Sequence, residues 1–298
     1  MKSVLPTVAF AVTLPFSLAG CVVVDSQGHI AREEKRFTVT GTPELHLTTF
    51  DGAIEIRSGD TKTIVIEIEK RGPTKEAIEQ LRIETKQDGN RVEIEVKKPT
   101  HEIVFFGVGH MSPTAKLIVT MPPEGNVVAR SGDGSIRIEH VHGQLQLRTG
   151  DGSIRGTDIG GQLTLATGDG SVTLDDVEGD LDVDTGDGSV SVAGKLALAK
   201  LHTGDGSITF RAAPGSAMKD DWSMTTGDGG VALYLPSDFG AELDAHTGDG
   251  SIRNELNVAT DNDGDRDKER RTLKGKIGAG GRTLRIRTGD GSIRLKTS

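Results

Sequence analysis

A short turn motif, Ser/Thr-Gly-Asp-Gly, recurs along the second half of the chain and constrains the fold more than any other feature. Its Asp residues are Asp133, Asp151, Asp169, Asp187, Asp205, Asp228, Asp249 and Asp290. The first five copies lie 18 residues apart, and the later intervals are 23, 21 and 41 residues. A fixed period followed by insertions is typical of a solenoid, in which each repeat forms one coil stacked on its neighbour.

Each repeat contains two short runs in which apolar and polar residues alternate. Alternation with period two indicates β-strands with one buried face, and a spacing of about 4.8 Å between coils joins the inward positions into one core. The predicted inward columns are Ile136, Ile154, Val172, Val190 and Ile208; Leu145, Leu163, Leu181, Ala199 and Trp222; Leu147, Leu165, Val183, Leu201 and Met224; and Thr149, Thr167, Thr185, Thr203 and Thr226. We therefore predict an all-β fold, a right-handed β-helix-like solenoid over residues 123–298, which the copy at Asp290 closes.

Two roles fit the Asp-Gly of the motif. In the structural role, Gly takes a positive φ angle in a tight turn, and Asp accepts hydrogen bonds from nearby backbone N–H groups. In the functional role, the eight aligned carboxylates bind Ca²⁺, as in β-rolls built from nonapeptides. A β-roll carries its motif on both turns of each coil, whereas here only one turn per coil contains Asp-Gly. We therefore favour the structural role, keep the cation ladder as the alternative, and expect no cofactor and no other metal site.

The first residues indicate export and lipid anchoring. Met1-Lys2 is a basic start, Val4–Leu18 is largely apolar, and the segment ends in Leu-Ala-Gly-Cys. This ending resembles a bacterial lipobox, which predicts a signal peptide over residues 1–20 and lipidation of Cys21. Cys21 is the only cysteine of the chain, so no disulfide is expected. Val22 follows it rather than Asp, which favours sorting to the outer membrane.

The charge balance excludes one class of partner. The whole chain has a formal net charge of −9, and removal of residues 1–20 with Lys2 gives −10. A nucleic-acid-binding surface is basic, so no nucleic-acid partner is expected.

The region before the repeats is predicted to differ from them. Residues 21–35 are polar and are interpreted as a tether between the lipid and the folded body. Residues 36–122 form a β-rich capping portion in which Thr49–Ile54 is a degenerate copy of the repeat. The segment Thr74–Leu81 is the one helix candidate, with Thr74 as its N-cap. The apolar run Ile103–Val108 is interpreted as a buried strand, with an exposed partner-binding loop as the alternative.

Four segments together resemble the DUF4097 family of adhesin-like proteins. They are a Glu-x-x-Phe-x-Val strand at Glu34–Val39, the repeat copy at Thr49–Ile54, the helix at Thr74–Leu81 and a closing glycine-rich segment at Gly278–Thr288. The resemblance covers residue 36 to the C-terminus and implies a β-solenoid on an exported or membrane-anchored protein, without enzyme activity. The family often has Asn at the turn where this chain has Asp, which supports the structural role of the motif.

Three functions are weighed from these features. The first is a non-enzymatic, lipid-anchored envelope protein whose repeated outward Ser, Thr and Arg side chains, such as Ser135, Arg137, Ser153 and Arg155, bind an envelope protein or glycan. The second is a calcium-binding module. The third is a polysaccharide-acting enzyme, which needs a local break in the repeat that gathers an acid and a base. We favour the first, because the columns are regular and the acids Asp180, Asp182 and Asp184 fit a solvated face near Lys200.

Overall fold

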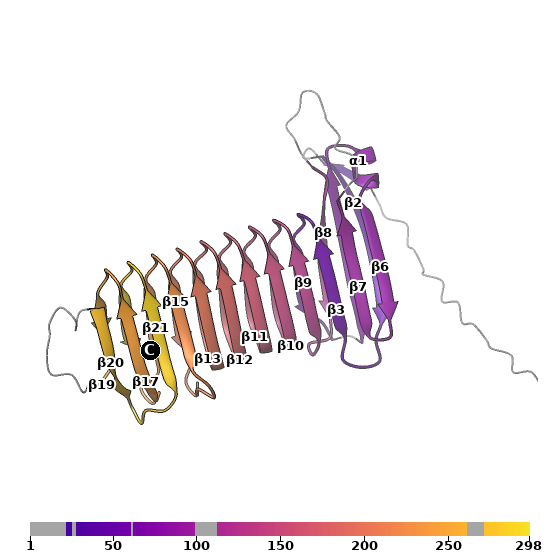
Figure 1. Cartoon of the computed structure of the whole chain (residues 1–298). Coiled ribbons are helices and arrows are strands. Elements are labelled where there is room, and N and C mark those ends of the chain that lie inside the picture. Colours follow the sequence, from indigo (N-terminus) through magenta and orange to yellow (C-terminus); the bar gives the residue numbers. More distant parts are fainter. Residues whose placement is uncertain (1–21, 26–27, 61, 99–111, 261–270) are drawn as a thin grey trace, which may run out of the picture.

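The computed structural model describes residues 22–25, 28–60, 62–98, 112–260 and 271–298, and in them one sheet of 22 strands winds into a stack of coils (Figure 1). The strands before the regular repeats are β1 (Val22–Asp25), β2 (Gly28–Thr38), β3 (Glu44–Thr49), β4 (Ile54–Ser58), β5 (Thr63–Gly72), β6 (Arg82–Asp88), β7 (Arg91–Lys97), β8 (Thr114–Met121) and β9 (Asn126–Ser131). The regular coils are β10 (Ile136–Thr149), β11 (Ile154–Thr167), β12 (Val172–Thr185) and β13 (Val190–Thr203). The remaining strands are β14 (Ile208–Ala212), β15 (Trp222–Thr226), β16 (Val231–Leu235), β17 (Ala241–Thr247), β18 (Ile252–Asn254), β19 (Val258–Ala259), β20 (Thr272–Ile277), β21 (Thr283–Thr288) and β22 (Ile293–Thr297).

The 18-residue period is confirmed as the repeat of the coils. Strands β10 to β13 pair in parallel, and equivalent residues of β10 and β11 lie side by side, as Ile136 does with Ile154 and Leu145 with Leu163. Strands β10, β11 and β12 each bend within their 14 residues, because His140, Asp158 and Asp176 adopt φ angles of 57°, 50° and 55° at equivalent positions. The bend lets one strand supply both sides of a coil.

The predicted columns form the core. All four are buried, including the Thr column, and the apolar ones belong to a single hydrophobic cluster that runs the length of the stack. Ala199 is the smallest side chain of its column, and the next member of that column is Trp222. The Trp222 ring packs edge-on against Phe210, with ring centroids 5.3 Å apart. The indole Nε1 donates a hydrogen bond to the carbonyl of Ala197 at 3.2 Å, so the buried ring keeps its polar atom paired.

The order of the coils in space differs from their order in the sequence. Strand β21 lies between β15 and β17, and β22 lies between β16 and β18, so the Asp290 coil is inserted between the Asp228 and Asp249 coils (Figure 1). The expectation that the Asp290 copy closes the solenoid is therefore wrong. Leu284, Ile286 and Ile293 are fully buried, which requires a neighbouring coil on each side. The end is instead covered by β20, which runs antiparallel to β17 and carries the exposed Lys274 and Lys276.

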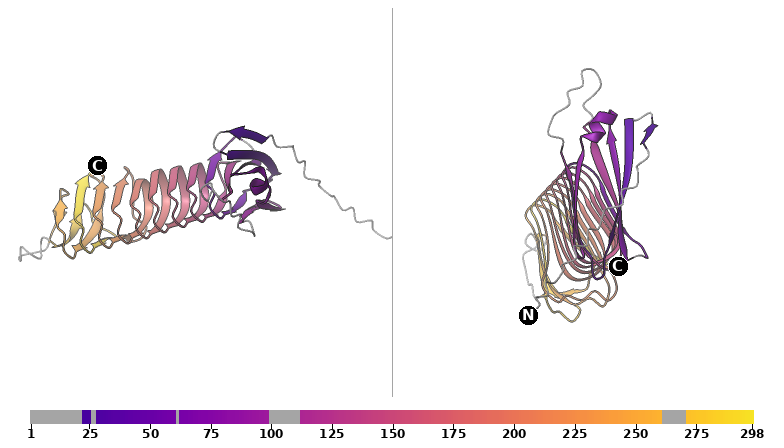
Figure 2. Two further views of the ribbon diagram at one scale, coloured as in Figure 1. Left: turned by 90° about the horizontal axis from the view of Figure 1, so that it is seen from above. Right: turned by 90° about the vertical axis from the view of Figure 1, so that its right-hand side faces the viewer.

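The other end of the stack is also closed by antiparallel strands. The copy of the repeat formed by β3 and β4 lies inside the stack, between β7 and β8 on one side and β9 and β10 on the other. The charged strand β6 then pairs antiparallel with β7, and β5 with β8. The predicted helix is present as α1 (Lys75–Glu79), capped by the Oγ1 of Thr74, which accepts from the N–H of Ala77 at 3.2 Å. It packs against β2 and β5 at the end of the pair where β2 begins and β5 ends (Figure 2).

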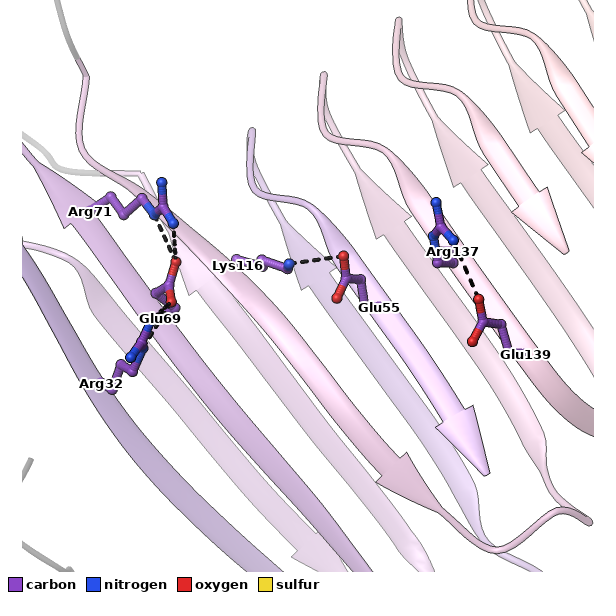
Figure 3. A network of polar contacts seen from close by, with 7 residues as sticks. All are labelled: Arg32, Glu55, Glu69, Arg71, Lys116, Arg137 and Glu139. Atoms are coloured by element: carbon purple, nitrogen blue, oxygen red, sulfur yellow. Dashed lines mark hydrogen bonds and ion pairs between the residues drawn. The ribbon is translucent and has the colours of Figure 1, made fainter. Parts of the chain in front are cut away.

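The interpretation of residues 21–35 as a tether is wrong from Val22 onward. Strand β1 pairs antiparallel with β2, and β2 pairs antiparallel with β5 along its whole length. Part of the charge of β2 is paired with the neighbouring strand: Arg32 lies 2.6 Å from Glu69 (Figure 3). Burial raises the pKa of the Glu69 carboxyl, but hydrogen bonds from Arg32 and Arg71 outweigh it, so the pKa ends below its usual value. The Arg32–Glu69 pair and a second pair, Glu33 with Lys70 at 3.4 Å, thus hold β2 on β5.

Candidate functional site

The Ser/Thr-Gly-Asp-Gly turns lie along one edge of the solenoid. The degenerate copy adds Asp51 to the eight predicted positions, because the backbone of Phe50 and Gly52 lies against Gly132 and Gly134. From strand pairing, the order of the turns in space is Asp51, Asp133, Asp151, Asp169, Asp187, Asp205, Asp228, Asp290 and Asp249.

The glycines of the motif serve close packing between coils and not a positive φ angle, which corrects the prediction. None of them is among the residues with positive φ in the described part of the chain. A Cβ on Gly152 would lie 2.3 Å from the carbonyl oxygen of Gly134, and one on Gly170 would lie 2.0 Å from that of Gly152. At the first glycines the approach is slightly less close: a Cβ on Gly168 would lie 2.8 Å from the carbonyl oxygen of Gly150, which accepts from the Gly168 N–H at 2.5 Å.

The Thr that begins each motif, and not the Asp, makes the side-chain hydrogen bonds of the turn. The Oγ1 of Thr167 lies 3.1 Å from the carbonyl oxygen of Gly150 and 2.9 Å from that of Gly152, both in the preceding coil. In the same position, the Oγ1 of Thr203 also accepts from the N–H of Gly206 at 3.2 Å. The sequence contained a signal for this role: the Thr lies on the inward face of its strand, where the other residues are apolar.

The Asp carboxylates point to solvent. All eight predicted Asp residues are exposed, and in the described segments no backbone N–H donates to any of their side chains. Asp51, at the end of the row, is half-buried, and burial followed by the charge of Asp133 raises the pKa of its carboxyl. Within the described residues, no three His, Cys, Asp or Glu side chains are gathered to hold a metal ion. The cation ladder stays a hypothesis.

Replacing Asp151, Asp169 and Asp187 together by Asn tests that hypothesis. We expect the triple variant to be as stable as the wild type or more stable, because repulsion of about 1 kcal/mol per neighbouring pair is removed. Thermal unfolding of both proteins, each in EDTA and in millimolar Ca²⁺, is the measurement. We expect two nearly calcium-independent melting temperatures; a rise of many degrees with Ca²⁺ that only the wild type shows would establish the cation ladder instead.

The two outward faces are polar, as predicted. Arg137 and Arg155 are exposed at adjacent positions of β10 and β11, and Arg137 contacts Glu139 at 3.4 Å (Figure 3). On the other face, Asp182, Asp184 and Lys200 line a shallow depression of about 330 Å³ together with polar side chains of β13 and β15. Asp180 does not line this depression and forms an ion pair with Lys219 instead. The acidic strand is therefore a solvated face, as interpreted from the sequence.

Two predicted segments cannot be placed. Cys21 and Ile103–Val108 lie outside the described residues. In the part of the chain that the structure describes, no helix is long and apolar enough to cross a membrane.

The repeat, the stacked turns and the antiparallel ends define a β-solenoid of the Toastrack type. The sequence profile described as Toastrack DUF4097 matches residues 43–296, and the chain belongs to this family. No curated protein matches the chain.

Several crystal structures resemble the chain at low similarity. One is called a "putative adhesin" from Bacteroides fragilis, with 11% identity, coverage of 89% of this chain and 96% of that chain, and a TM-score of 0.40. Another "putative adhesin", from Parabacteroides merdae, has 13% identity, coverage of 89% and 95%, and a TM-score of 0.38. A "putative lipid binding protein" from Parabacteroides distasonis has 11% identity, coverage of 89% and 96%, and a TM-score of 0.34. At these TM-scores the resemblance carries no functional argument.

Proposed function

We propose that the chain is an exported, lipid-anchored and non-enzymatic protein of the cell envelope, whose solenoid binds an envelope protein or glycan. The observation that carries this proposal is the in-register stacking of β10 to β12, which β13 continues except at a local shift of register near its middle. It repeats each outward position at the spacing of the strands, so that Ser, Thr and Arg side chains form rows on a long polar face. A repeated face of this kind suits multivalent contact with an extended partner.

The anchor belongs to the proposal through the lipobox that ends at Cys21. Because β1 begins at Val22 and pairs with β2, the ordered sheet begins one residue after the predicted lipidation site. An anchor at that position would hold the β2 end of the solenoid close to the membrane and let the rest of the stack extend from it. The absence of Asp after Cys21 favours the outer membrane.

An enzyme is the less favoured function. Polysaccharide hydrolysis uses two carboxyl groups on either side of the scissile bond. Among the described residues, the depression on the acidic face holds Asp182 and Asp184 on one strand, at alternate positions of a regular coil.

Replacing Cys21 by Ser in the full-length chain tests the anchor. The variant is expected to be unlipidated, because it has no thiol to accept a lipid, and to move from the lipidated membrane form to a soluble or an uncleaved form. The measurement is fractionation with mass spectrometry of the N-terminal peptide, with Ser26→Ala as the control that keeps the thiol. Cleaved variant that still sediments with membranes would contradict lipid anchoring.

A further inference from the structure

The regular repeat is interrupted at one corner of the solenoid, where three connections meet. They are residues 213–221 between β14 and β15, residues 236–240 between β16 and β17, and residues 278–282 between β20 and β21. The connections meet because β21 is inserted between β15 and β17. The N–H of Thr283 donates to the carboxylate of Asp221 at 2.9 Å, and the N–H of Glu242 donates to the carbonyl of Arg282 at 3.0 Å.

These three connections enclose an open cavity of about 600 Å³. Its lining includes the side chains of Ala217, Met218, Asp238 and Arg282 and the backbone of Gly240 and Gly281. The volume lies within the range of about 300–1,000 Å³ that is usual for small-molecule sites. The regular coils have no equivalent of these loops, so the cavity is a local addition to the repeat.

The two charged groups of the cavity are free to bind a ligand. Arg282 and Asp238 are exposed, and within the described chain neither side chain makes an ion pair or a hydrogen bond. Gly281 has a φ angle of 136°, and a Cβ there would have only the Gly240 carbonyl, at 3.8 Å, within 4 Å. Glycine is therefore needed here for its φ angle and not for close packing. Its backbone atoms stay accessible beside Arg282 and Asp238.

The chemistry of these groups selects a ligand class. A guanidinium matches a carboxylate with two parallel hydrogen bonds, a carboxylate accepts from hydroxyl groups, and the thioether of Met218 gives an adaptable apolar surface. The Asp238 carboxylate opposes a simple anion, which has no hydroxyl group to donate to it. A ligand that suits both charged groups carries a carboxylate and several hydroxyls on one ring.

We propose that this cavity binds a carboxylated saccharide, a uronic acid unit of an acidic glycan. Arg282 holds the sugar carboxylate, Asp238 accepts from ring hydroxyls, and Met218 packs on the ring. The inference rests on the proposed binding function and names a ligand for it. It includes no reaction, since Asp238 is the only carboxylate among the described residues that line the cavity.

Calorimetric titration with a galacturonic acid trisaccharide tests the site, with the neutral galactose trisaccharide as the matched probe. The mature chain carrying Cys21→Ser keeps every described strand and is the reference protein. We expect the reference to bind the acidic probe about ten-fold or more tightly than the neutral one, and Arg282→Gln to abolish that difference. Asp238→Asn should weaken both probes, and Ala217→Trp should block both.

A control variant separates recognition from misfolding. Arg285→Gln removes an exposed arginine of β21 that does not line the cavity, so it should not alter affinity. Melting temperatures of all variants should match the reference.

The proposal fails if the reference does not bind the acidic trisaccharide, or if Arg282→Gln binds it as tightly as the reference does. If envelope material still retained the reference protein, the proposed binding function would stand without this site. If the reference protein neither bound the acidic trisaccharide nor was retained by envelope material, the proposed function would be overturned as well.

Discussion

Leu165→Asp is expected to unfold the regular coils, with a loss of at least about 4 kcal/mol in the free energy of unfolding. Leu165 is 1% exposed and lies in the inward column between Leu147 and Val183. The substitution removes a buried aliphatic side chain and places a charge where no polar group can pair with it. Denaturant unfolding followed by circular dichroism measures the loss, and hydrogen exchange should show it first in β10 to β12.

Thr164→Asp is the matched control for this prediction. Thr164 is exposed on the same strand and lies beside Gln146 and Asp182. The new carboxylate stays in water, so its cost is limited to repulsion by Asp182 of about 1 kcal/mol. Equal destabilisation by the two substitutions would show that the inward and outward faces have been assigned wrongly.

Gly170→Ala is expected to destabilise the stack by about 3 kcal/mol or more, although it adds a single methyl group. The new Cβ would lie 2.0 Å from the carbonyl oxygen of Gly152 and 2.5 Å from its carbon. Backbone atoms cannot move away as a flexible side chain can, so the coils must separate and lengthen the hydrogen bonds between them. Thermal and denaturant unfolding of the purified variant measure the effect.

Gly230→Ser provides the comparison within the same motif. Gly230 occupies the position that is Ser207 and Ser292 in the neighbouring coils, and its nearest contact for a Cβ is the carbonyl oxygen of Ser292 at 3.1 Å. We expect a change of no more than about 0.5 kcal/mol. If Gly170→Ala changed the stability as little as Gly230→Ser does, the motif would need glycine for flexible turns and not for close contact between coils.

The local structure of the coils could be predicted from the sequence because a period of 18 residues fixes which side chains become neighbours. The alternation around Leu163 and Leu165 assigned the inward face correctly, and Thr74 marked the start of α1. The roles of the turn residues were harder to predict. A glycine that is needed for close backbone approach looks the same in sequence as one that is needed for positive φ.

The order of the coils could not be predicted, because a coil with apolar inward residues can pack equally well on any other such coil. Trp222 lies beside Leu284 of β21, although Leu243 of β17 comes first in the sequence and presents an equally apolar neighbour. The cavity around Asp238 and Arg282 depends on that order, so it could not be predicted either. Strand β2 was missed because Arg32 and Glu33 find their partners, Glu69 and Lys70, on β5, and this pairing cannot be seen along the chain.

Co-sedimentation of the mature chain carrying Cys21→Ser with envelope material of the producing cell tests the central claim most directly. The account predicts saturable, reversible retention of the protein and no new reducing or unsaturated sugar ends in the polysaccharide. Protease or periodate treatment of the envelope then shows whether a protein or a glycan retains it. Absence of retention would contradict a binding role, and shortened polysaccharide chains would contradict a non-enzymatic one.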